Sequence, residues 1–158
     1  MLFLQQMKIE EAIKQKRFKN EKVKASIYII YTANWLQDVM RQFFDRYDLS
    51  NQQYNVLRIL RGQYPVAIST CDIRSRMLDK MSDVSRIVAR LSTAGLVTQK
   101  SNAKDKRLVD VKISAKGLRL LETIDHDMEE METVMNGITN AEAKQLNDIL
   151  DKLKSNKY

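Results

Sequence analysis

The side chains best suited to bind another molecule lie on a short basic segment near the middle of the chain. Arg86 and Arg90 are four residues apart, so on a helix they share one face, while Val84 and Val88 lie on the opposite face. An arginine near the start of such a helix can bind O6 and N7 of guanine, and serine hydroxyls can bind phosphate. The DNA contacts predicted on this segment are Ser82, Asp83, Ser85, Arg86 and Arg90.

Asp83 is the residue of this segment that is hardest to explain, because a carboxylate repels DNA phosphates. Its oxygens can accept a hydrogen bond from N4 of cytosine, or they can stabilise the N-terminus of the helix. For the segment as a whole, the alternative interpretation is a charged helix face that contacts only solvent.

A second basic segment follows, with the pattern of a β-hairpin. Residues 96–100 are predicted to form one strand, and Val109, Val111 and Ile113 alternate with polar residues as in a half-buried second strand. A basic hairpin tip can enter a narrow minor groove, where the negative potential is enhanced; the alternative is an ordinary basic turn. The DNA-binding residues predicted here are Lys100, Lys104, Asp105, Lys106 and Arg107.

The distribution of charge favours a polyanionic partner. The chain has 158 residues and a formal net charge of +7. Residues 74–112 contain 10 basic and 4 acidic side chains, whereas residues 118–158 contain 5 basic and 9 acidic ones. The positive charge is therefore concentrated around the two basic segments, which favours nucleic acid over a membrane surface; the alternative is a basic protein without a polyanionic partner.

Two other sites could support chemistry, and each has a simpler interpretation. Cys71 lies near the start of a short predicted helix, where a thiol pKa can fall, but a buried apolar cysteine is more common. His126 lies four residues from both Glu122 and Glu130, a spacing that could hold a divalent metal, but an exposed acidic helix face is more common. We predict no metal ion and no cofactor.

Aromatic residues on the first long predicted helix could line a cavity for a small aromatic ligand. These residues are Tyr31, Trp35 and Phe43. Such a stripe is more often simply part of the core, and both interpretations stay open.

Composition excludes several classes of protein. One cysteine excludes an internal disulfide and a cysteine-cluster zinc site, and one histidine argues against histidine-based catalysis. The sequence has no evident nucleophile–base pair and no glycine-rich phosphate loop, so we do not expect an enzyme. No run of 18 apolar residues and no signal-peptide pattern occur, so we expect a cytoplasmic protein without a membrane partner.

The elements that must position these residues are mainly helical. Apolar spacing and capping residues predict helices over 26–46, 50–61, 69–79, 82–94, 114–135 and 139–154. Ser69 and Ser82 are the expected N-caps of the two short helices in the middle. In the first of these two helices, Ile73, Met77 and Leu78 are expected to face inward.

These elements predict a mainly α fold, a winged helix-turn-helix with a three-helix core and a β-hairpin wing. Long N- and C-terminal dimerisation helices complete it, because the apolar face of the helix over 26–46 is too wide for one neighbour. The expected organisation is an N-terminal arm or helix extension at 1–25, a dimerisation helix at 26–46, a winged DNA-binding domain at 50–117 and C-terminal dimerisation helices at 118–158.

From about residue 26 to residue 153 the chain resembles the MarR family of bacterial transcription regulators. The segments that carry the resemblance are MSDVSRIVARL at 81–91, AGLV at 94–97, DKR at 105–107 and VKISAKG at 111–117. The resemblance implies a triangular homodimer that binds a palindromic duplex, usually as a repressor, and that often releases DNA when a small phenolic ligand or an oxidant acts near the dimer interface. It also implies that Asp105 orients Arg107 or ties the wing to its own domain.

Two features depart from the family pattern. The first 25 residues exceed the usual start, and Cys71 is not near the beginning of the first long helix, where oxidant sensors of the family commonly carry a cysteine.

The residues therefore predict a sequence-specific, double-stranded DNA-binding regulator that acts as a homodimer. The resemblance adds that it is a repressor and that a small aromatic ligand can relieve it. The alternative is a winged-helix protein-interaction module without specific DNA binding. A module of that kind should have a neutral or acidic helix and wing, whereas both are basic here.

Overall fold

The computed structural model describes residues 7–102, 105, 106 and 108–155. The chain divides into two compact units, residues 1–51 and residues 52–158. No helix among the described residues is both long and apolar enough to cross a membrane.

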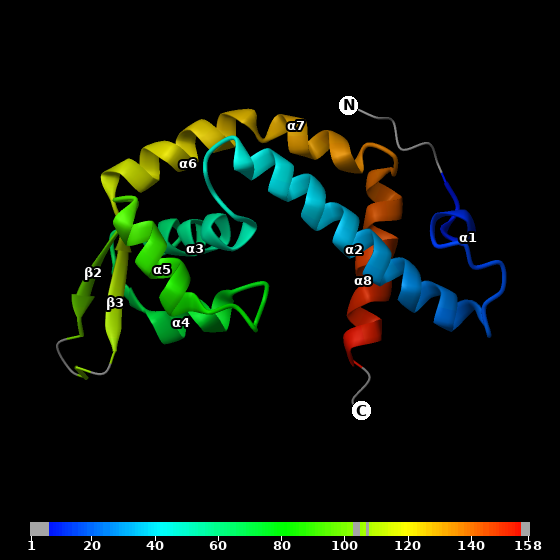
Figure 1. Cartoon of the computed structure of the whole chain (residues 1–158), viewed down its shortest axis with the longest axis horizontal. Coiled ribbons are helices and arrows are strands. Elements are labelled where there is room, and N and C mark those ends of the chain that lie inside the picture. Colours follow the sequence, from blue (N-terminus) through cyan, green and yellow to red (C-terminus); the bar gives the residue numbers. More distant parts are fainter. Residues whose placement is uncertain (1–6, 103–104, 107, 156–158) are drawn as a thin grey trace. The chain divides into compact units, whose positions relative to one another are not determined.

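The first unit contains a short helix α1 (Ile9–Ala12) and a long helix α2 (Glu21–Asp45) (Figure 1). Helix α2 begins five residues before the predicted start because the side chain of Asn20 accepts a hydrogen bond from the Val23 N–H and caps the helix there. Before α2, Ile9 is fully buried, and its N–H donates to the Tyr28 hydroxyl over 3.2 Å.

An ion pair also holds α1 to α2. The Lys24 ammonium lies 2.5 Å from a Glu10 carboxylate oxygen. Their hydrogen bond holds the pKa of Glu10 below its ordinary value and raises the pKa of Lys24. Each group is thus stabilised in its charged form by the other.

Much of the apolar face of α2 is exposed within the chain. Only two residues of the helix are buried, Phe43 and Phe44. The exposed large apolar residues of this helix are Val23, Tyr28, Ile29, Ile30 and Tyr31.

The second unit contains a helix-turn-helix core and a small sheet (Figure 1). Its helices are α3 (Asn51–Arg61), whose first residue belongs to the first unit, α4 (Thr70–Arg76) and α5 (Val84–Thr93). The strands β1 (Ile68–Ser69), β2 (Val97–Ser101) and β3 (Val109–Ile113) form an antiparallel sheet in the order β1-β3-β2. The mainly helical winged fold is therefore confirmed.

Apolar residues from the three helices, from β2 and β3, and from positions next to them form the core of the winged region. The buried apolar residues are Tyr54, Val56, Leu57, Leu60, Ile73, Met77, Val84, Val88, Leu91, Leu96, Val97, Val111 and Ile113. They include Val84 and Val88, which the sequence analysis placed opposite the two arginines, and Val111 and Ile113 of the alternating strand. The third apolar residue of that strand, Val109, is half-buried.

The sequence prediction for α4 was wrong at its C-terminal end. The helix is capped by Ser69 as expected, but it ends at Arg76 rather than near Asp79. Leu78 does not face inward: it is 84% exposed. The following residues form a turn instead of a further helical turn, because Asp79 binds the backbone and side chain of residues that follow it.

The predicted N-cap of α5 was also wrong by one residue. Asp83 caps the helix, since its Oδ1 accepts a hydrogen bond from the Arg86 N–H over 3.1 Å. Ser82 instead donates its hydroxyl proton to Asp79 over 2.9 Å.

The C-terminal part of the chain forms α6 (Ala115–Asp127), α7 (Glu129–Glu132), a 3-10 turn η1 (Thr133–Met135) and α8 (Asn140–Ser155). Ser114 caps α6 as expected. The long helix predicted over 114–135 is interrupted at Met128, whose N–H bonds to the Asp125 carbonyl three residues earlier and so tightens the turn there. Strand β2 lies one residue later than predicted, and the two-residue strand β1 was not predicted.

Candidate nucleic-acid interface

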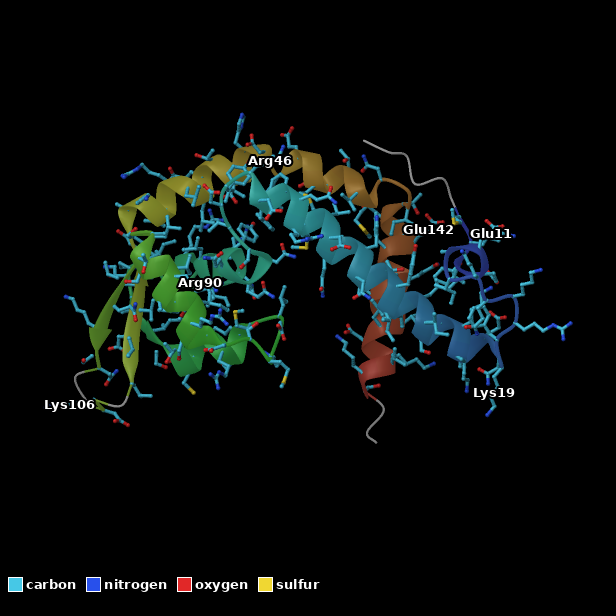
Figure 2. All side chains as sticks on the ribbon, in the orientation of Figure 1. Glu11, Lys19, Arg46, Arg90, Lys106 and Glu142 are labelled. Carbon is cyan, nitrogen blue, oxygen red and sulfur yellow. The ribbon has the colours of Figure 1, made fainter. Side chains whose placement is uncertain are left out.

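Helix α5 presents its polar face to solvent. Its buried residues, Val84, Val88 and Leu91, hold the opposite face against the core. Arg86 and Arg90 are exposed on the polar face, and neither forms an ion pair with another described residue. Figure 2 labels Arg90 on this helix. Both guanidinium groups are therefore available to an external acceptor.

The other predicted residues of this segment differ in how freely they could bind an external ligand. Ser85 is exposed on α5. Ser82 is half-buried and gives its one hydroxyl proton to Asp79, so it can act toward a ligand only as an acceptor while that bond lasts. The Asp83 carboxylate caps the helix, which is the second of the two roles considered for it.

The wing is the hairpin formed by β2 and β3. The strands pair from Val97 with Ile113 to Ser101 with Val109. At the tip, Lys106 is exposed (Figure 2). Lys104 and Arg107, two further predicted contacts, lie outside the described residues.

Asn102 shapes the wing tip, and sequence analysis missed it. Its amide donates to both carboxylate oxygens of Asp110, over 2.8 and 3.0 Å. Its Oδ1 accepts from the N–H of the half-buried Asp105 over 3.0 Å, and its own N–H donates to the Leu108 carbonyl. An asparagine opening a polar turn commonly bonds the backbone in this way, so its position was an available signal.

The outer face of the sheet carries a cavity of about 810 Å³. The predicted contact Lys100 lines it together with two residues that sequence analysis did not select, Tyr64 and Lys112. The Lys112 ammonium lies 5.3 Å from the centre of the Tyr64 ring, a cation–π distance. The cavity thus places two lysines beside an aromatic ring on the wing.

The predicted aromatic ligand residues all lie on α2, but none of them lines this cavity. Tyr31 is 43% exposed, Trp35 is half-buried and Phe43 is buried. The Phe43 ring packs edge-on against Phe44, with ring centres 5.2 Å apart, which is the arrangement of a core residue.

The remaining candidates lie apart from these surfaces. Cys71 is exposed on α4, so the buried interpretation was wrong. His126 is exposed on α6. Across the described part of the chain, no group of three histidine, cysteine or acidic residues could hold a metal ion; the side chain of Glu130 is not described.

A charged cluster ties the winged core to α6. The Arg61 guanidinium binds both carboxylate oxygens of Asp125, over 2.5 and 3.2 Å, and Arg58 lies 3.5 Å from the same carboxylate. The hydrogen bond to Asp125 raises the pKa of Arg61. A two-bond arginine–carboxylate pair fixes both distance and orientation, so it holds α3 against α6 in one geometry.

Comparison with known proteins shows similarity to one family of transcription regulators. The sequence model of the MarR family matches residues 47–108. The chain is 28% identical over 128 residues to the HTH-type transcriptional repressor IacR of Pseudomonas putida, covering 80% of this chain and 72% of that protein.

Solved structures show the same fold. A MarR transcription factor from Planctomyces limnophilus is 26% identical, with a TM-score of 0.67 over 87% of this chain and 98% of that one. A cysteine-to-serine mutant of MarR from E. coli, complexed with operator DNA, is 20% identical, with a TM-score of 0.75 over 87% of this chain and 99% of that one. The matching segment, the repressor relative and the winged fold all make this chain similar to proteins of the MarR family.

Proposed function

We propose that this protein is a sequence-specific regulator of transcription that binds double-stranded DNA. The observation that carries the proposal is the exposed face of α5, where Arg86 and Arg90 have no ion-pair partner among the described residues. Helix α5 is the second helix of a helix-turn-helix, which is the element that enters the major groove in this class of fold. Lys100 and Lys106 on the adjacent wing extend the cationic surface toward the sugar–phosphate backbone and the minor groove.

We propose further that the regulator is a repressor. The named relative from Pseudomonas putida is a repressor, and a dimer bound to an operator blocks transcription by occupying the site. Loss of the protein should then raise expression of the genes next to its strongest binding sites.

The proposed assembly is a homodimer that binds a palindromic operator. Its support is the amount of apolar surface that a single chain leaves exposed on α2 and α8. On α8 the exposed apolar residues are Leu146, Ile149 and Leu153. A two-fold dimer buries the same patch on both subunits and so presents two copies of α5 to the duplex.

The proposed regulation is release of DNA by a small aromatic effector. Its support is the family resemblance, together with the aromatic residues Tyr31 and Trp35 on α2. A series of hydroxylated aromatic acids, titrated into the protein–operator complex, tests this point. At least one of them should weaken operator binding in the parent protein and have less effect on Trp35→Ala.

Genomic selection of bound DNA tests the main proposal. Purified protein is mixed with sheared genomic DNA, and the retained fragments are sequenced and footprinted. A common motif that outcompetes random duplex supports a sequence-specific regulator. Retention without a shared motif would contradict it and favour a non-specific basic protein.

A further inference from the structure

The turn between α4 and α5 carries the two most exposed large apolar side chains of the described chain. Leu78 is 84% exposed and Met81 is 91% exposed. The next most exposed large apolar residues, Val66 and Ile149, reach 63%. Exposing apolar surface to water is unfavourable, so two such side chains three residues apart suggest a partner.

Hydrogen bonds hold this turn in one shape, and the two apolar side chains take no part in them. The Asp79 carboxylate accepts from the Met81 N–H and from the Ser82 hydroxyl, both over 2.9 Å. The Leu78 N–H donates to the side chain of Asn55 on α3 over 3.1 Å. Because the backbone is already fixed, little conformational entropy is lost when the turn meets a partner.

The turn carries charges of both signs, and its carboxylates are bonded to the protein itself. The carboxylates of Asp79 and Asp83 both accept hydrogen bonds within the turn or at the start of α5. The Lys80 ammonium donates to the Ser75 carbonyl over 2.6 Å, and Arg86 follows on the exposed face of the helix. The turn therefore presents its two apolar side chains close in sequence to Arg86, which has no ion-pair partner among the described residues.

The turn is also continuous with the surface proposed to bind DNA. It leads directly into α5, and it projects beyond the ends of the two helices that it joins (Figure 1). In helix-turn-helix proteins the N-terminal residues of the second helix contact base edges in the major groove. Among base edges in that groove, the apolar group is the C5-methyl of thymine.

We propose that Leu78 and Met81 contact thymine C5-methyl groups in the operator and so help to determine its sequence. The inference rests on the proposed DNA-binding function and adds an apolar contribution to the hydrogen bonds of Arg86. Operators should accordingly carry thymines at fixed positions beside the bases that Arg86 contacts.

Replacement of thymine by deoxyuridine tests this directly, because it removes the methyl group and keeps the base pair. Each contacted methyl should strengthen binding by about fourfold, equivalent to about 0.8 kcal/mol for one buried carbon group. The parent protein should therefore bind a singly substituted operator about fourfold more weakly at the contacted positions. Met81→Ala should bind the thymine and deoxyuridine operators equally at the positions that Met81 contacts. Leu78→Ala should do the same at the positions that Leu78 contacts.

Two controls separate methyl contact from other effects. Val66→Ala removes an exposed apolar side chain from another loop of the same unit and should keep the full response to deoxyuridine. Met81→Gln keeps a side chain of similar length with a polar end and should lose the response as Met81→Ala does. Circular dichroism should show that all variants are folded, since Leu78 and Met81 are outside the core.

The possible failures are distinguishable. Equal binding of thymine and deoxyuridine operators by the parent protein would overturn the inference while leaving the proposed function intact. A response that persists unchanged in Leu78→Ala, Met81→Ala and Met81→Gln would also overturn it. If the parent protein showed no preference for any genomic site over random duplex, the proposed function itself would fail.

Discussion

Acidic residues in the basic segment bond to the protein itself. Asp79 binds the turn before α5, Asp83 caps that helix, and both oxygens of Asp110 accept from the side-chain amide of Asn102. Meanwhile Arg86 and Lys106 have no ion-pair partner among the described residues. Carboxylates that stabilise turns and caps therefore leave the outward-facing cations available to an external anion.

Arg86→Ala should weaken operator binding by roughly 1–3 kcal/mol and relax the base preference at one position, because a bidentate contact to guanine is lost. Binding to random duplex should change much less. Titration of the variant on both duplexes measures the two effects separately. Arg119→Ala, which removes an exposed arginine from α6, is the matched control and should bind as the parent does. If Arg86→Ala bound both duplexes with the affinity of the parent protein, α5 would not be the helix that recognises the operator sequence.

Lys106→Ala should behave differently, since a lysine at the wing tip is expected to contact phosphate. Affinity should fall by a similar factor for every sequence, and the slope of log K against log salt should become shallower by about one unit. Binding isotherms at several salt concentrations give this slope. A fall confined to one sequence would point to a base contact instead.

At the scale of elements, sequence periodicity predicted most of the winged core and missed its short features. Strand β3 was predicted correctly because Val109, Val111 and Ile113 alternate with polar residues. Strand β1 has two residues, too few to produce a periodic signal. The N-cap of α5 was misplaced because Ser82 and Asp83 are both good caps, and only the position of the Asp79 carboxylate distinguishes them.

The exposure of a site residue could be predicted where it follows from helix periodicity. It could not be predicted where it depends on contacts with other segments of the chain. The exposure of Arg86 and Arg90 follows from their spacing opposite buried valines. The exposure of Leu78 does not follow from spacing, because it depends on the early end of α4. Likewise, the approach of Lys112 to Tyr64 joins residues 48 positions apart in the sequence.

The start of α6 packs against the backbone just before β2. A substitution at Gly117 tests how closely the two segments pack. A Cβ at Gly117 would lie 2.3 Å from the Leu96 carbonyl oxygen and 2.8 Å from a side-chain carbon of Ile113. Gly117→Ala should therefore lower the free energy of unfolding by about 3 kcal/mol, measured by urea denaturation. Gly137→Ala is the control: apart from the adjacent residues, no described atom lies within 4 Å of the position its methyl group would take, so the stability of this variant should stay near the parental value.

The capping box of α4 predicts a pH dependence of stability. Hydrogen bonds from the Ser69 hydroxyl and N–H hold the pKa of Asp72 below its ordinary value of 3.8. The stability that this carboxylate contributes is therefore present at neutral pH and is lost as the pH falls through its folded-state pKa. Asp72→Asn should lower the urea midpoint at pH 7, and the difference from the parent should shrink below pH 3.8. Asp148→Asn, an exposed change on α8, should show no such trend.

At the scale of the whole molecule, the exposed apolar residues of α2 and α8 predict a homodimer. Sedimentation equilibrium at micromolar concentration should give twice the chain mass of 18.4 kDa. Replacement of Ile149 and Leu153 by lysine should shift the protein toward monomer, because both are more than half exposed on α8. Asn147→Lys, which adds charge at an exposed polar position of the same helix, should remain dimeric. A purely monomeric parent protein would contradict the proposed assembly.

The proposed two-fold dimer also predicts the geometry of the operator. Two copies of α5 related by a two-fold axis should enter successive major grooves, so the operator should be an inverted repeat with half-site centres about 10 bp apart. Inserting about 5 bp between the half-sites rotates one of them by about half a helical turn, and affinity should then fall toward that of a single half-site. The same insertion placed outside the repeat should have no effect. Hydroxyl-radical footprints of the three duplexes measure this, and a single asymmetric footprint on the parental site would exclude two-fold docking.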